Sequence, residues 1–219
     1  MSAFNLAGLT RGQLRAALSD ATRKLTYVKE TVRNIPDAYI PFNRLQEISF
    51  LEQRLSEYKA ELARRFTDAA APAHVFYSYS RRDEPLMAEL DEQLSGLRSE
   101  GRIKTFWDRD IGAGREWHSE ITEELQDADI VLFLMSDDYL ASRYCQQVEI
   151  PVALEMHDQG LVRAIPIILR ACKWQASPLG RLQAIPRNGR PVTEWVHRSE
   201  ALVEVMQGIQ AAIDEVRQI

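Results

Sequence analysis

One carboxylate, Glu149, falls on a predicted helix shortly after a predicted buried strand. The strand, residues 129–135, is a short apolar run that ends at the small polar residue Ser136, as strands of buried parallel sheets do. Open α/β sheets bind their ligands at the carboxyl ends of their strands. A helix carboxylate ordinarily faces solvent, but this position favours a role for Glu149 in a binding or catalytic site.

Polar side chains also follow an earlier predicted strand, residues 74–79. Hydroxyl and charged groups on a loop between a strand and a helix suit contacts with sugar hydroxyls and phosphates. The alternative is that they cap the helix that follows. The candidate binding residues on this loop are Ser78, Tyr79, Ser80, Arg81 and Asp83.

Two aromatic residues, Phe106 and Trp107, end the strand predicted at residues 103–107, and the polar segment 108–116 follows them. Their rings either stack on a bound base or pack in the core. The segment contains Gly112 and Gly114, but it lacks the third glycine of a dinucleotide-binding fingerprint. Its glycines are better explained by the backbone freedom that a sharp turn requires.

Together, these segments resemble the Toll/interleukin-1 receptor (TIR) domain, most closely its bacterial stand-alone form, over about residues 73–217. The alternation of strands and helices itself predicts an α/β fold with a parallel sheet. The resemblance implies a flavodoxin-like, five-stranded sheet with helices on both faces. We expect strands at 74–79, 103–107, 129–135 and 162–169, a short fifth strand near 191–193, and helices at 84–100, 117–127, 137–158 and 199–217.

Many TIR domains are similar in activity to NAD⁺ glycohydrolases, with an essential glutamate in a Ser…Trp-Cys…Glu pattern after the third strand. The resemblance implies that Glu149 is the catalytic residue and that NAD⁺ is a substrate, with no cofactor and no metal. This chain departs from the pattern in having Tyr144 where Trp is common, one extra residue before the glutamate, and Pro151, which is expected to kink the helix just beyond Glu149. The matching residues, added to the candidate substrate-binding set, are Ser142, Tyr144 and Cys145.

The proposed chemistry suits a carboxylate. Breaking the bond between nicotinamide and ribose develops oxocarbenium-like positive charge on the sugar, as in glycoside hydrolysis. Nicotinamide leaves as a neutral group, so the reaction needs no strong general acid. A carboxylate beside the ribose can hold its hydroxyls and stabilise the developing cation.

In TIR domains, the loop after the second strand contacts other copies and borders the nucleotide pocket. The resemblance therefore implies a homo-oligomer formed by TIR–TIR contacts, with NAD⁺ cleavage activated by assembly in bacterial immune defence and a linear or cyclic ADP-ribose product. Two alternatives stay open: a non-enzymatic TIR adaptor and a nucleoside deoxyribosyltransferase-like enzyme. The implied assembly residues are Asp108, Arg109, Asp110, Ile111, Gly112 and Gly114.

Residues 1–70 predict a separate helical module ahead of the TIR-like domain of residues 73–219. Thr10 and Gln13 have the spacing of a capping box, and apolar residues then recur every three or four positions up to a break at 35–41. A second apolar series continues to Phe66. This pattern indicates a helical hairpin, which serves either as a cap on the second module or as an assembly or sensing unit.

Composition narrows the class of protein further. The 219-residue chain has neither a membrane-length apolar run nor a signal-peptide pattern, which predicts a cytoplasmic protein with no membrane partner. Its two cysteines fit a reduced compartment, and its histidines and cysteines lack metal-ligand spacing. Residues 1–70 carry a net charge of +3 and residues 71–219 a net charge of −8, with no basic cluster dense enough for nucleic acid.

Overall fold

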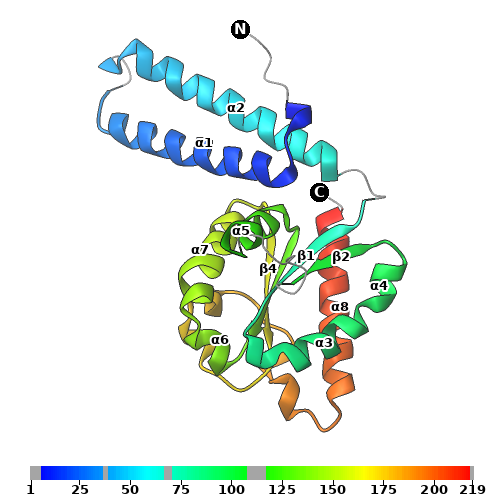
Figure 1. Ribbon diagram of the computed structural model, residues 1–219. Coiled ribbons are helices and arrows are strands. Elements are labelled where there is room, and N and C mark those ends of the chain that lie inside the picture. Colours follow the sequence, from blue (N-terminus) through cyan, green and yellow to red (C-terminus); the bar gives the residue numbers. More distant parts are fainter. Residues whose placement is uncertain (1–5, 37–38, 67–70, 108–116, 218–219) are drawn as a thin grey trace. The chain divides into compact units, whose positions relative to one another are not determined.

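The computed structural model describes residues 6–36, 39–66, 71–107 and 117–217 (Figure 1). The chain divides into two compact units, Met1–Thr67 and Asp68–Ile219. Within the described residues, no helix is both long and apolar enough to cross a bilayer.

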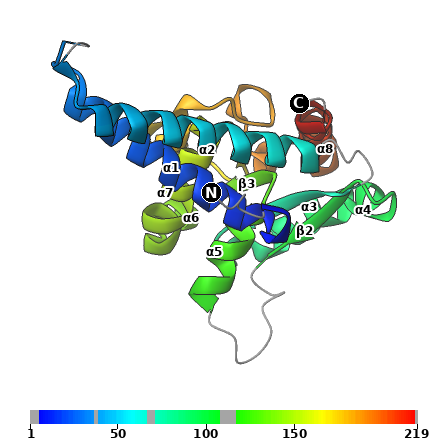
Figure 2. The same ribbon diagram turned by 90° about the horizontal axis from the view of Figure 1, so that it is seen from above.

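The first unit is a helical hairpin, as predicted. A short 3₁₀ turn, η1 (Leu6–Gly8), precedes α1 (Arg11–Val32), and α2 (Phe42–Phe66) returns beside it (Figures 1 and 2). The predicted capping box begins α1: the Gln13 amide donates to the Thr10 hydroxyl over 3.1 Å, and the Thr10 amide donates to the Gln13 side chain over 2.9 Å. The apolar series of both helices supplies buried side chains, among them Leu14, Leu18, Val28, Leu51 and Leu62.

The second unit is an α/β domain around a parallel sheet, which confirms the predicted fold class. The sheet has the order β2-β1-β3-β4, and every pair is parallel. Its strands are β1 (Ala73–Ser78), β2 (Ile103–Phe106), β3 (Ile130–Met135) and β4 (Arg163–Ile168). All six residues of β3 are buried, because helices cover both faces of the sheet.

Figure 1 shows the two helical layers. On one side lie α3 (Glu84–Gln93), α4 (Ser95–Ser99) and α8 (Arg198–Arg217). On the other lie α5 (Trp117–Asp127), α6 (Asp137–Ala141) and α7 (Ile150–Asp158). An apolar core packs the sheet against the first layer, with buried residues of α3 and α8 such as Met87, Leu90, Val205 and Ile209.

The predicted fifth strand near Pro191–Thr193 is wrong for the described residues, whose sheet has four strands. Val192–Glu194 forms a 3₁₀ turn instead, and the outer edge of β4 makes a single bridge, between Ile167 and Ile185. Pairing cannot continue past Ile185, because Pro186 has no N–H and the Arg187 amide donates to the Glu204 carboxylate.

Two predicted long helices are interrupted. The helix predicted at 84–100 breaks at Leu94 into α3 and α4. The helix predicted at 137–158 is α6, then an extended residue at Ser142, a π-helical turn η5 (Cys145–Glu149), and α7. Pro151 lies two residues past the π-helical turn, which continues directly into α7, and it supplies no N–H to the helix. The irregularity therefore falls at and before Glu149 rather than beyond it.

Candidate functional site

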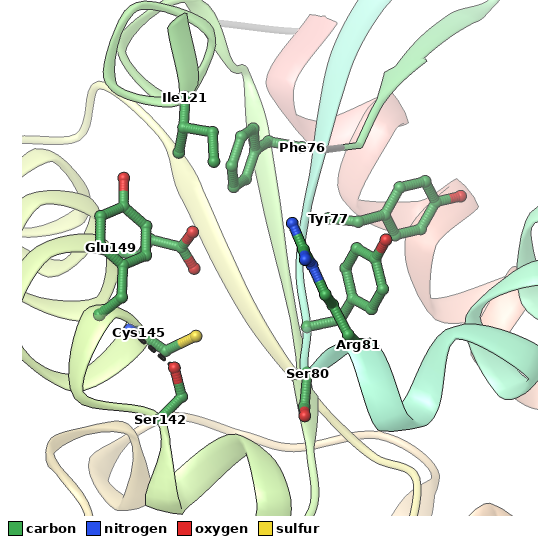
Figure 3. Close-up of a pocket in the computed structure, with 10 residues that line it drawn as sticks. Phe76, Tyr77, Ser80, Arg81, Ile121, Ser142, Cys145 and Glu149 are labelled. Carbon is green, nitrogen blue, oxygen red and sulfur yellow. Dashed lines mark hydrogen bonds between the residues drawn. The ribbon is translucent and has the colours of Figure 1, made fainter. Parts of the chain in front are cut away.

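A cavity of about 360 Å³ lies where the strand order reverses, beside the carboxyl end of β1 and facing the helices that follow β3. Successive connections leave β1 and β3 toward opposite edges of the sheet at this point, and ligands of doubly wound folds bind at such switch points. The cavity is lined by Phe76, Tyr77, Tyr79, Ser80, Arg81, Ile121, Ser142, Tyr144, Cys145 and Glu149 (Figure 3).

Glu149 closes the π-helical turn, and its side chain is only 5% exposed. In Figure 3, it reaches from the helical side of the cavity toward the strand that carries Phe76 and Tyr77. The Ser78 hydroxyl, at the end of β1, donates a hydrogen bond to Glu149 Oε2. Strand and helix thus meet through one serine–carboxylate contact at the wall of the cavity.

The π-helical turn explains how the extra residue before Glu149 is accommodated. The Ile150 N–H donates to the Cys145 carbonyl, five residues back, where an α-helix would use the fourth. Such a turn takes up one additional residue, and π-turns of this kind are frequent at functional sites. Tyr144 and Glu149, five residues apart, both line the cavity as a result.

Burial and the Glu149 charge keep the neighbouring acids protonated. Burial, followed by the negative charge of Glu149, raises the pKa of the Cys145 thiol to about 12. The same two causes raise the pKa of Tyr144 to about 12. At neutral pH, Cys145 is therefore a thiol rather than the thiolate that nucleophilic catalysis needs. Among the lining residues, Glu149 supplies the negative charge and Arg81 the positive charge.

A second buried carboxylate, Asp83, lies on the loop after β1 and is fully enclosed. Arg170, which follows β4, donates from Nε to Asp83 Oδ1 over 2.8 Å, and the Ser136 hydroxyl donates to Asp83 Oδ2. Ser136 also caps α6 by accepting the Tyr139 amide over 3.0 Å. Asp83 therefore ties together the segments that follow β1, β3 and β4.

The structure brings most of the sequence-predicted site residues to one place. Ser78 bonds to Glu149, and the predicted residues that line the cavity with Glu149 are Tyr79, Ser80, Arg81, Ser142, Tyr144 and Cys145. Ser142 also accepts the Cys145 amide over 3.3 Å, which supports the start of the π-helical turn. Their contact with a substrate stays a prediction.

Besides Ser78, which contacts Glu149 without lining the cavity, three predicted residues are not among the lining residues. Asp83 is committed to Arg170 and Ser136. Phe106 stacks on Phe76 with ring centroids 6.0 Å apart, and Trp107 packs against the apolar core that includes α3 and α8. For the two aromatic residues, the structure matches the alternative of core packing.

Four residues at the site were not selected from the sequence: Phe76, Tyr77, Ile121 and Tyr139. The first three resemble ordinary core positions of a strand and a helix. Tyr139 had a usable signal, since it stands three residues after the capping Ser136 and ten before Glu149.

The predicted assembly residues, Asp108–Gly114, lie outside the described residues. Within the described part of the chain, no group of three or more His, Cys, Asp or Glu side chains is placed to hold a metal ion.

Comparison with known proteins identifies the family. A family model described as the TIR domain matches residues 75–202. The uncharacterized protein y4lF of Sinorhizobium fredii is 44% identical over 142 residues, covering 65% of this chain and 44% of that protein, so the chain spans less than half of this relative. The crystal structure of the TIR domain of the Toll-related receptor TRR-2 from Hydra magnipapillata is 19% identical, with a TM-score of 0.46, and the match covers 62% of this chain and 97% of that one. Because the family match covers more than half of its residues, the chain belongs to the TIR domain family.

Proposed function

We propose that this TIR domain cleaves NAD⁺ between nicotinamide and ribose, and that Glu149 stabilises the positive charge that develops on the ribose. The observation that carries the proposal is a single buried carboxylate at the wall of a cavity, held there by Ser78. Burying a carboxylate carries a desolvation cost even when it is hydrogen-bonded. A site that binds a cationic transition state repays that cost, because a charge is worth more in a water-poor cavity than in bulk solvent.

The cleavage step needs no proton donor from the protein, because the leaving group departs as a neutral molecule. The bonding pair of the glycosidic bond leaves with the pyridinium nitrogen, which neutralises its positive charge and releases nicotinamide. Water, or a second nucleophile of the substrate in the cyclic case, then adds to the ribose carbon and gives up a proton. Glu149 holds and stabilises the ribose between these two steps. Cys145 and Tyr144 are neutral at working pH and do not compete for the cation.

The other lining residues suit the remaining parts of the substrate. Arg81 offers a guanidinium for the diphosphate, and Ser80 offers a hydroxyl beside it. Tyr79 and Tyr144 offer aromatic faces for nicotinamide. Ligand pockets for drug-sized molecules range from about 300 to 1,000 Å³, and this cavity of about 360 Å³ is at the small end. We infer that it takes the nicotinamide-ribose half of the dinucleotide.

Two rivals make different use of the same residues. An adaptor would contact other TIR domains through its surface, and it would need the Glu149 carboxylate only for the structural bond to Ser78. A nucleoside deoxyribosyltransferase-like enzyme would use a glutamate for a related cleavage, but a nucleoside lacks the diphosphate that Arg81 is suited to hold. Activation by assembly and a role in bacterial defence are part of the proposal through the family resemblance.

The test is to incubate the purified full chain with NAD⁺ over a range of protein concentrations and to quantify nicotinamide and ADP-ribose by chromatography. We expect nicotinamide release whose rate per molecule rises with concentration, because mass action favours the assembled form. Deoxynucleosides with a free base are assayed in parallel. Self-association without nicotinamide release at any concentration would favour the adaptor, and base exchange on deoxynucleosides would favour the transferase.

A further inference from the structure

A chain of buried hydrogen bonds continues behind Glu149. The Ser78 oxygen that contacts Glu149 also lies 2.7 Å from the Tyr139 hydroxyl. Ser78 and Tyr139 are both fully enclosed. Tyr139 is not among the residues that line the cavity, and its hydroxyl is linked to the carboxylate by hydrogen bonds through Ser78.

The direction of these bonds follows from counting hydrogens. An ionised carboxylate can only accept hydrogen bonds, so Ser78 must donate its single hydroxyl hydrogen to Glu149. Ser78 then has none left for Tyr139 and must accept, which makes Tyr139 the donor. Burial raises the pKa of Tyr139 well above its usual value, and the electrostatic interactions with Cys145 and Glu149 add to the rise. Tyr139 therefore keeps its hydrogen over the whole working range of pH.

Tyr139 is fixed at its other end as well. Its backbone amide donates to Ser136, whose own hydroxyl donates to Asp83, and Asp83 is paired with Arg170. Its ring packs edge-on against Phe133, with centroids 6.5 Å apart. These contacts hold the side chain on both sides, with its hydroxyl 2.7 Å from the Ser78 oxygen.

We propose that Tyr139 is a positioning residue for Glu149: its hydroxyl orients the Ser78 hydroxyl, which in turn fixes the carboxylate in its ionised form at the cavity wall. The inference rests on the proposed function for its effect on catalysis. Its structural part, the coupling of Tyr139 to the Glu149 carboxylate through Ser78, can be measured without any substrate.

The first measurement is substrate-free. Glutamate side-chain carboxyl carbons are labelled with ¹³C, the Glu149 signal is assigned by its loss in Glu149→Gln, and its titration is followed by NMR. Tyr139→Phe removes only a hydroxyl and keeps the ring against Phe133. A donated hydrogen bond favours the charged form of a carboxylate, so weakening it moves the Glu149 titration to higher pH, by about half a pH unit or more. The other titratable groups facing Glu149, namely Cys145, Tyr144 and Arg81, are the same in both proteins.

The second measurement is steady-state NAD⁺ cleavage by Ser78→Ala, Tyr139→Phe and the double variant. We expect each single change to lower kcat about tenfold with KM altered less than about threefold, because binding is kept while charge stabilisation is lost. The double variant should be no slower than Ser78→Ala alone, since both changes cut one connection. Ser177→Ala is the matched control. It deletes a serine hydroxyl that donates to the Trp174 carbonyl over 2.6 Å, outside this chain of bonds.

The outcomes separate the two ideas. If the wild-type protein releases no nicotinamide, the proposed function fails, and the NMR titration alone decides the positioning role. A Glu149 titration unchanged in Tyr139→Phe overturns the proposal whatever the rates are. Unchanged kcat in both single variants of an active enzyme overturns it too, as does a double variant whose loss is the product of the single losses.

Discussion

Replacing Asp83 with Asn tests how the site is held together. Asp83 is fully enclosed, whereas the side chain of its partner Arg170 is 47% exposed. The amide keeps one acceptor oxygen, which can serve either Ser136 or Arg170, and turns an NH₂ donor toward the other. One charge-assisted hydrogen bond is lost, worth about 1.5–3 kcal/mol. The larger penalty of a wholly buried pair does not apply, because Arg170 regains water. We expect the free energy of unfolding to fall by about 2 kcal/mol.

Urea unfolding followed by tryptophan fluorescence measures this loss selectively. All four tryptophans lie within residues 68–219, so the signal reports on the TIR unit alone. The matched control is Asp158→Asn, which breaks a 2.6 Å pair with Arg181 whose side chains are 49% and 56% exposed. An exposed pair of this kind is worth at most about 1 kcal/mol. Equal, small losses in the two variants would refute the view that Asp83 anchors the carboxyl edge of the sheet.

Three further predictions concern stability and modularity. The pKa of the Cys145 thiol is about 12 in the folded protein, against an ordinary value of 9.0. As pH rises, the unfolded chain therefore loses this proton before the folded protein does. Between those two pH values, Cys145 lowers the free energy of unfolding by up to about 1.4 kcal/mol per pH unit. The stability difference between wild type and Cys145→Ala in alkaline urea titrations should change with that sign, and a constant difference would contradict it. A Cβ at Gly180 would overlap the backbone of Gln175, whereas one at Gly96 meets nothing within 4 Å. In thermal unfolding, Gly180→Ala should lower the free energy of unfolding by about 1–3 kcal/mol, and Gly96→Ala should raise it by about 0.5 kcal/mol. The reverse order would be incompatible with the structure. Removal of residues 1–70 should leave a folded TIR unit, because Asp68–Ile219 is compact by itself. The removal should nevertheless alter oligomer size or NAD⁺ cleavage. The same oligomeric state by light scattering and the same cleavage rates would exclude an assembly role for the hairpin.

Most helices and strands of the fold could be predicted from local sequence patterns. The strand at 130–135 could be predicted because each of its residues is apolar and buried, and α1 because its capping box is a contact within four residues. The fifth strand could not, because residues 192–194 close a 3₁₀ turn in which the Glu194 amide donates to the Pro191 carbonyl. The Thr193 amide still bonds to the Leu169 carbonyl just past β4, so the segment lies beside the sheet without forming a strand.

Some features of the candidate site could likewise be predicted from the sequence, and others could not. Glu149 could be selected because its position relative to a strand end is local information. The role of Asp83 could not be read from the sequence, since its partner Arg170 stands 87 residues later. The π-helical turn was hidden too, although its cause, one extra residue between Tyr144 and Glu149, is visible in the sequence once the turn is known.

The most direct test of the central claim compares Glu149→Gln with Glu155→Gln. Gln is nearly isosteric and can still accept from Ser78, so the fold should be kept while the charge is lost. Glu155 receives the same substitution on α7 at an exposed position. Nicotinamide release is measured for both variants and the wild type at equal, high protein concentration. We predict that Glu149→Gln lowers the rate about 100-fold, on the order of 3 kcal/mol of transition-state stabilisation, while Glu155→Gln stays near wild type. Wild-type turnover by Glu149→Gln would contradict the assignment of Glu149 as the catalytic carboxylate.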